Sequence, residues 1–157
     1  AHFDFPVNGW SRTPKALQGV RGFHGPDAFN DFLAASRVLV NLLPLTPETE
    51  GIMNRGTLSR LPQGGYVINV ARGAHLVEED LLALVDSGHL AGATLDVFRT
   101  EPLPPGHPFW SHPKIVATPH TSARTLREES IAQIVRKIGQ MDRGEPVAGT
   151  VDRARGY

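Results

Sequence analysis

The chain has 157 residues, which is about the length of one domain and enough to bury a hydrophobic core. Its 16 Lys and Arg residues balance its 16 Asp and Glu residues, so charge indicates no nucleic-acid partner, and no apolar run approaches the ~20 residues of a membrane helix. The absence of cysteine excludes disulfides, thiolate metal sites and cysteine nucleophiles, and we expect a soluble protein of the cytoplasm.

Strand and helix patterns alternate along the sequence. A short strand at residues 7–10 and a short helix at residues 26–36 come first. Four nearly continuous apolar runs follow, typical of strands covered on both faces: residues 38–43, 66–70, 93–98 and 115–118. Apolar residues at helical spacing predict a helix ending before Gly88 and another ending before Gly144, and prolines predict a loop at residues 102–108. This order predicts an α/β fold with a parallel, doubly wound sheet.

Polar residues follow the apolar runs where an open parallel sheet binds ligands, beyond the carboxyl ends of its strands. Arg72 supplies a fixed cation for a carboxylate, and His120 with Glu101 makes a pair suited to proton transfer. Each also has a simpler interpretation: a surface arginine, a helix-capping turn residue and a solvated loop acid. Asp96 lies inside an apolar run, so its carboxylate requires a specific hydrogen-bonding partner.

A second polar cluster, residues 11–15 with Ser11 and Arg12 at its start, follows the first predicted strand. Its two hydroxyls, guanidinium and ammonium group suit a phosphate monoester, although a charged turn is the commoner explanation of such a cluster. The histidines other than His120 show no metal-ligand spacing, so we expect no metal site and predict surface or turn positions for them. They are His2, His24, His75, His89, His107 and His112.

Longer strings carry a family resemblance. The sequence contains NLLPLTPETEGIMN and then GGYVINVARG through IVATPH, and these strings resemble the C-terminal part of the D-isomer-specific 2-hydroxyacid dehydrogenases. The strings WSRTPK and VDRARGY resemble the glyoxylate/hydroxypyruvate reductase A branch. The resemblance implies a Rossmann-type fold, a homodimer, and NADPH-dependent reduction of glyoxylate or hydroxypyruvate, small 2-oxo acids.

The resemblance also implies residue roles. Arg72 would bind the substrate carboxylate and carbonyl, and His120 would be the general acid. Glu101 would hydrogen-bond His120 and favour its protonated form. Asp96 resembles the acid that meets the nicotinamide carboxamide. Three further residues match positions that line the adenosine and nicotinamide pocket: Leu43, Pro44 and Ala71.

Cofactor choice follows from the Ser11 and Arg12 pair. Relatives that prefer NAD place an acid for the ribose 2′-hydroxyl about where Ser11 stands, so this pair implies NADP in preference to NAD. The same pair argues against a phosphoglycerate dehydrogenase. Formate dehydrogenases pair the histidine with glutamine, where this chain has Glu101. Non-catalytic nucleotide-sensing corepressors of the family keep the Arg, Glu and His, and they stay an alternative.

No G-x-G-x-x-G string is present in the chain. We therefore expect a partial dinucleotide-binding domain at residues 1–146 and a tail at residues 147–157 that docks on a substrate domain. The glycine-loop strand and that substrate domain would be absent, and the fragment inactive alone. In the strand order 3-2-1-4-5-6, the missing strand would leave residues 7–10 to pair with residues 38–43, to become irregular, or to pair with a second copy.

Overall fold

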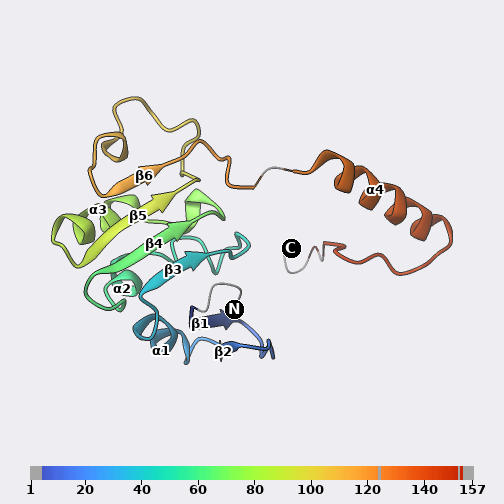
Figure 1. Ribbon diagram of the computed structural model, residues 1–157, viewed down its shortest axis with the longest axis horizontal. Helices are drawn as coiled ribbons and strands as arrows, with labels where there is room; N and C mark the ends of the chain where they lie inside the picture. Colours follow the sequence, from blue (N-terminus) through green and yellow to red (C-terminus); the bar gives the residue numbers. More distant parts are fainter. Residues whose placement is uncertain (1–4, 124, 152, 154–157) are drawn as a thin grey trace.

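A four-stranded parallel sheet forms the centre of the structure (Figure 1). The computed structural model describes residues 5–123, 125–151 and 153. The sheet has the order β3 (Val38–Asn41), β4 (Gly65–Asn69), β5 (Leu90–Leu95) and β6 (Ile115–Ala117). All neighbouring strands are parallel. The α/β fold with a parallel sheet is confirmed.

Two helices cover one face of this sheet. They are α2 (Arg55–Leu58) and α3 (Glu78–Asp86), and α3 buries Leu81, Leu84 and Val85 against the strands. The opposite face carries Val40 and Val116, which are 46% and 52% exposed. Within the described residues, helices thus cover only one face of the sheet, whereas the apolar runs predicted that both faces would be covered. The burial alternates with period two, but the sequence hides this because residues on both faces are apolar.

The N-terminal strands form a separate two-stranded sheet. β1 (Val7–Ser11) pairs in parallel with β2 (Val20–His24), and α1 (Phe29–Ala34) packs on it through Trp10 and Phe29, whose ring centroids are 4.8 Å apart. The prediction did not include β2. Pairing of residues 7–10 with residues 38–43 was wrong, and so was an irregular segment; pairing with a second copy stays a prediction.

The last helix, α4 (Arg127–Asp142), confirms the helix predicted before Gly144. It stands apart from both sheets (Figure 1), and none of its residues is buried. No helix among the described residues is long and apolar enough to cross a membrane. The predicted tail, residues 147–157, lies partly outside the described residues.

Two short 3-10 helices complete the described elements: η1 (Gly73–His75) and η2 (Pro108–Trp110). η2 lies at the end of the predicted proline-rich loop and buries Phe109, which is 1% exposed. η1 directly follows Arg72, so it lies at the carboxyl end of β4, where the predicted site residues meet.

Candidate functional site

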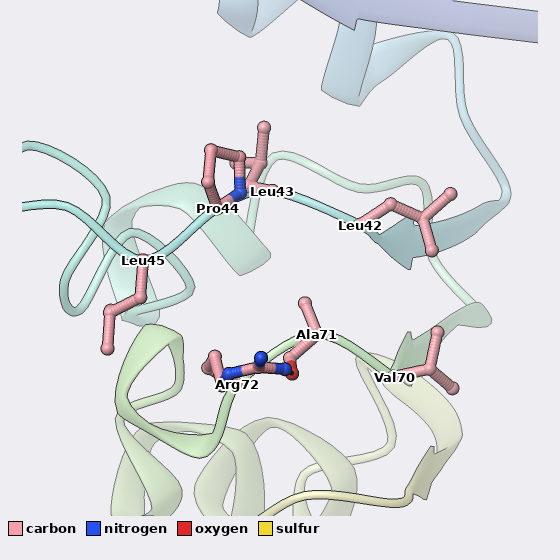
Figure 2. A pocket seen from close by; sticks show the side chains of 7 residues that line it. All are labelled: Leu42, Leu43, Pro44, Leu45, Val70, Ala71 and Arg72. Atoms are coloured by element: carbon pink, nitrogen blue, oxygen red, sulfur yellow. Dashed lines mark hydrogen bonds between the residues drawn. The ribbon is translucent and has the colours of Figure 1, made fainter. Parts of the chain in front are cut away.

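A cleft of about 630 Å³ lies beyond the carboxyl ends of β3 and β4. Figure 2 shows its two walls, residues 42–45 after β3 and residues 70–72 after β4. All four residues that were predicted for this region line it: Leu43, Pro44, Ala71 and Arg72. The walls are apolar except for Arg72, which suits a ligand with flat apolar rings and one anionic group.

His120 and Glu101 lie within hydrogen-bonding distance, as the sequence predicts. His120 Nδ1 is 2.9 Å from Glu101 Oε2, and the other Glu101 oxygen accepts from the Phe98 backbone N–H at 3.0 Å. Because an ionised carboxylate only accepts, Nδ1 donates, which directs Nε2 away from Glu101. The two side chains are 52% and 38% exposed, so a substrate can reach them.

The charges around Glu101 keep it ionised. The hydrogen bond from His120 lowers the pKa of the Glu101 carboxyl, and the hydrogen bond from Phe98 and the positive charge of Arg72 lower it further. Arg72 therefore acts on Glu101 electrostatically. Its guanidinium donates to the Ala71 carbonyl oxygen at 2.6 Å and keeps further N–H donors for a carboxylate.

Asp96 holds the segment that carries His120. It is 2% exposed, and its carboxylate accepts hydrogen bonds from Thr118 Oγ1, from the Thr121 N–H at 2.9 Å, and from the Ser122 N–H and hydroxyl at 3.0 and 2.6 Å. Burial raises the pKa of the Asp96 carboxyl, but the hydrogen bonds from Ser122 and Thr118 outweigh it and hold the pKa well below its usual range. The required partner of Asp96 is thus this segment.

The backbone at His120 is strained. Its φ of 53° lies in the left-handed region, which residues other than glycine rarely adopt. The N–H groups of residues 121 and 122 donate to the Asp96 carboxylate, which fixes the chain directly after His120 and so helps to hold this conformation. The predicted contact of Asp96 with the nicotinamide carboxamide stays a prediction.

Gly73 lets the Arg72 turn contact the segment before Glu101. A Cβ atom at residue 73 would lie 1.9 Å from the Phe98 carbonyl carbon. We expect Gly73→Ala to lower the free energy of unfolding by about 1–3 kcal/mol, the usual cost of overpacking, because backbone must move. Gly106→Ala is the control, since its Cβ meets nothing within 4 Å. Chemical denaturation of both variants measures the difference, and equal stabilities would contradict the close contact.

Ser11 and Arg12 lie at the end of β1. The Ser11 hydroxyl donates to the Thr13 carbonyl oxygen at 2.8 Å, and Arg12 is exposed. A hydrogen bond from Thr46 lowers the pKa of the Glu48 carboxyl, and the charge of Arg12 adds to this effect. Arg12 therefore acts on the loop that continues from the cleft wall after β3.

At the ends of β3 and β4 and in η1, three buried polar residues were missed by the sequence prediction: Asn41, Asn69 and His75. His75 is 0% exposed, so the prediction of a surface or turn position was wrong for this histidine. It failed because the residue lies in a loop between strand and helix patterns, where no periodicity reports burial. The two asparagines, which lie inside the apolar runs at residues 38–43 and 66–70, were an available signal. Among the described residues, no group of three potential metal ligands occurs.

The parallel sheet, with a cleft and charged residues beyond its strand ends, defines a nucleotide-binding domain of the Rossmann type. Residues 1–122 match the family model "D-isomer specific 2-hydroxyacid dehydrogenase, NAD binding domain". The chain belongs to this family, and the resemblance noted in the sequence is confirmed.

Solved structures agree with this assignment. A D-isomer specific 2-hydroxyacid dehydrogenase from Xanthobacter autotrophicus Py2, in complex with NADPH and MES, is 50% identical with a TM-score of 0.96, over 100% of this chain and 65% of that one. An NADPH-dependent glyoxylate/hydroxypyruvate reductase from Sinorhizobium meliloti, in complex with NADP and sulfate, is 37% identical with a TM-score of 0.94, over 99% and 51%. The chain thus spans about half to two thirds of these relatives' lengths.

Proposed function

We propose that the protein containing this chain reduces a small 2-oxo acid, glyoxylate or hydroxypyruvate, to the 2-hydroxy acid with NADPH. The observation that carries the proposal is that Arg72 lines the apolar cleft and acts electrostatically on Glu101, which accepts a hydrogen bond from His120. The Sinorhizobium meliloti relative, described as an NADPH-dependent reductase of these two acids, supports it.

The cleft residues fit a dinucleotide. Leu43, Pro44 and Ala71 provide apolar walls for flat rings, and Arg12 is the cation for a 2′-phosphate, with Ser11 beside it. When bound, the reduced nicotinamide supplies the hydride for the carbonyl carbon of the acid. Asp96 would meet the carboxamide side of the pocket. NADP is therefore the proposed cofactor, in preference to NAD.

The chain's own residues supply binding and the proton. Arg72 binds the substrate carboxylate, which orients the carbonyl group toward His120. His120 donates a proton from Nε2 to the carbonyl oxygen, because Nδ1 is held by Glu101. Glu101 keeps its negative charge and accepts the hydrogen bond from His120 Nδ1, which holds the ring in place for this step.

The organisation of the whole protein is part of the same proposal. Residues 1–146 form part of the dinucleotide-binding domain, and residues 147–157 dock on a substrate domain. The intact protein is a homodimer of the cytoplasm with a small-molecule substrate. Gel filtration of the full-length protein tests the dimer.

Turnover by the full-length protein tests the function. We expect oxidation of NADPH on addition of glyoxylate or hydroxypyruvate, with a higher kcat/KM for one of these two acids than for phosphohydroxypyruvate. A preference for phosphohydroxypyruvate would indicate a phosphoglycerate dehydrogenase. Binding of NADPH without turnover of any 2-oxo acid would indicate a nucleotide-sensing protein and overturn the proposal.

A further inference from the structure

A buried polar cluster lies beneath the two walls of the cleft. It consists of Asn41 at the end of β3, Asn69 at the end of β4, and His75 in η1, and it is named here the Asn-Asn-His cluster. Asn41 and Asn69 are register partners in neighbouring strands, and the three residues are 5%, 0% and 0% exposed. Buried polar groups persist where hydrogen bonds satisfy them, so the bonds of this cluster report what it holds in place.

One set of bonds fixes the wall that carries Arg72. Asn41 Nδ2 lies 3.0 Å from both Asn69 Oδ1 and His75 Nδ1. Asn69 Nδ2 donates to the Arg72 carbonyl oxygen at 3.0 Å, and Asn69 Oδ1 accepts from the Ala71 N–H at 3.2 Å. The backbone on both sides of the Ala71–Arg72 peptide is thus held by one amide.

A second set reaches the opposite wall. Asn41 Oδ1 accepts from the Leu43 N–H at 3.2 Å, and His75 Nε2 lies 3.3 Å from the Pro44 carbonyl oxygen. Nδ1 also lies 3.1 Å from the Arg72 carbonyl oxygen. A proton on Nε2 lets the ring donate to Pro44 and accept from Asn41 at Nδ1, whereas a proton on Nδ1 would face the Asn41 N–H and leave the Pro44 contact without a donor. The tautomer with the proton on Nε2 therefore satisfies more of these groups. His75 therefore links the wall after β3 to the cluster that holds the wall after β4.

The backbone of His75 is itself fixed. Its carbonyl oxygen accepts from the Met53 N–H at 2.9 Å, and the Val77 N–H donates to the Met53 carbonyl oxygen at 3.0 Å. Met53 and Leu76 form an isolated parallel bridge. The imidazole ring thus projects from a rigid segment, and a change in its bonds must be taken up by the walls.

We propose that His75, through the Asn-Asn-His cluster, sets the spacing of the two cleft walls and thereby positions Arg72 for the substrate carboxylate. This inference rests on the proposed function. His75 is fully buried and acts through Pro44 and Arg72, so it is a positioning residue and not a catalytic one. A small error in such spacing weakens binding because the guanidinium must meet a planar carboxylate in a defined geometry.

Two substitutions in the full-length protein separate the bonds of the ring. In His75→Gln the longer amide places its nitrogen near the position of Nε2 and keeps the bond to Pro44. In His75→Asn the shorter side chain keeps an acceptor for Asn41 but does not reach Pro44. We therefore compare a variant that retains the link between the walls with one that lacks it, and both side chains stay polar and uncharged.

Amide hydrogen exchange and kinetics provide the readouts. In His75→Asn we expect exchange at residues 42–46 to become about 5–10-fold faster, the factor for the loss of one ordinary hydrogen bond, and in His75→Gln to stay within about twofold. The KM for glyoxylate should rise by about the same factor in His75→Asn, with kcat and the pH–rate profile little changed, because His120 and Glu101 are untouched. His75→Gln should restore the wild-type KM.

Unchanged exchange in His75→Asn would overturn the inference, and so would faster exchange with a wild-type KM, which shows a purely structural role. If His75→Asn does not fold, Asn41→Ser replaces it, since it removes the amide donor to the ring. The same rise in KM is expected, and exchange is then compared at residues 45 and 46, because the Leu43 N–H also loses its acceptor in this variant. If the wild-type protein reduces no 2-oxo acid, the proposed function fails, and the exchange comparison alone still decides whether His75 couples the walls.

Discussion

Replacing His120 with alanine in the full-length protein is expected to lower kcat for glyoxylate reduction by ~10²–10⁴-fold, the usual contribution of a general acid. Among Arg72, Glu101 and His120, the histidine is the group that can deliver a proton to a carbonyl oxygen, since Glu101 is held ionised and arginine does not give up its proton. The KM should change much less, because Arg72 binds the carboxylate. Steady-state kinetics with NADPH measure both constants.

His107→Ala is the matched control for this substitution. His107 also pairs with a glutamate, at 3.3 Å from Glu78 Oε2, but it lies in the loop that precedes η2 and does not line the cleft. Its kcat should stay within about twofold of wild type. A His120→Ala variant that also keeps its kcat within about threefold would rule out His120 as the general acid.

Glu101→Gln tests how the pH dependence arises. The hydrogen bonds from His120 and from the Phe98 N–H lower the pKa of the Glu101 carboxyl. The carboxylate therefore stays charged as the pH falls past the ordinary glutamate pKa of ~4.3, and it loses its charge only at lower pH. Glu101 therefore keeps one charge state across the neutral range. In Glu101→Gln the side chain opposite the His120 ring carries no charge, and we expect the alkaline limb of the pH–rate profile to move to lower pH. Superimposable profiles would show that Glu101 does not tune His120.

The strands of the central sheet were predictable because each overlaps an apolar run. Their exact bounds were not, because an apolar run indicates which residues are buried and not which backbone groups form hydrogen bonds. The third run, predicted at residues 93–98, overlaps only the second half of β5, which ends at Leu95. Val97 and Phe98 continue the run because they are 1% and 7% exposed in the loop after the strand. The strand begins earlier, at Leu90, where Gly92 interrupts the apolar pattern.

β2 could not be predicted in the same way. Its sequence VRGFH mixes one arginine, one glycine, one histidine and two apolar residues, and three of its five residues are exposed. What makes it a strand is pairing with β1 and the contact of Phe23 with Phe32 of α1, whose ring centroids are 5.8 Å apart. Both are tertiary effects, which a local pattern does not report.

The meeting of polar residues beyond the carboxyl ends of the strands was predictable for a topological reason. In a parallel sheet every carboxyl end lies on one edge, so residues that follow separate strands meet there. The sequence predicted that Arg72, Glu101 and His120 share this edge; in the structure His120 contacts Glu101, and the charge of Arg72 acts on Glu101. The burial of His75 was not predictable, because it depends on loops after two strands closing over one ring. Residue types and positions indicated a carboxylate-binding cation and a proton-transfer pair, whereas the specific roles in reducing a 2-oxo acid came from the family resemblance.

Arg12→Ala in the full-length protein is expected to weaken NADPH binding by ~1.5–3 kcal/mol, the range for a charge-assisted hydrogen bond, or about 10–150-fold in Kd. NADH binding should stay nearly unchanged, because its ribose carries a hydroxyl where NADPH carries the 2′-phosphate. Fluorescence titration with each cofactor measures the two values.

The size of the Arg12 effect depends on its surroundings. Arg12 is exposed and its charge already acts on Glu48, so a bound phosphate would share the guanidinium with that carboxylate, and the loss should grow at low ionic strength, where screening is weaker. Arg60→Ala is the control, because Arg60 is an exposed arginine shortly before the amino end of β4, the end opposite the cleft. Equal losses of NADPH and NADH affinity in Arg12→Ala would show that Arg12 does not read the 2′-phosphate.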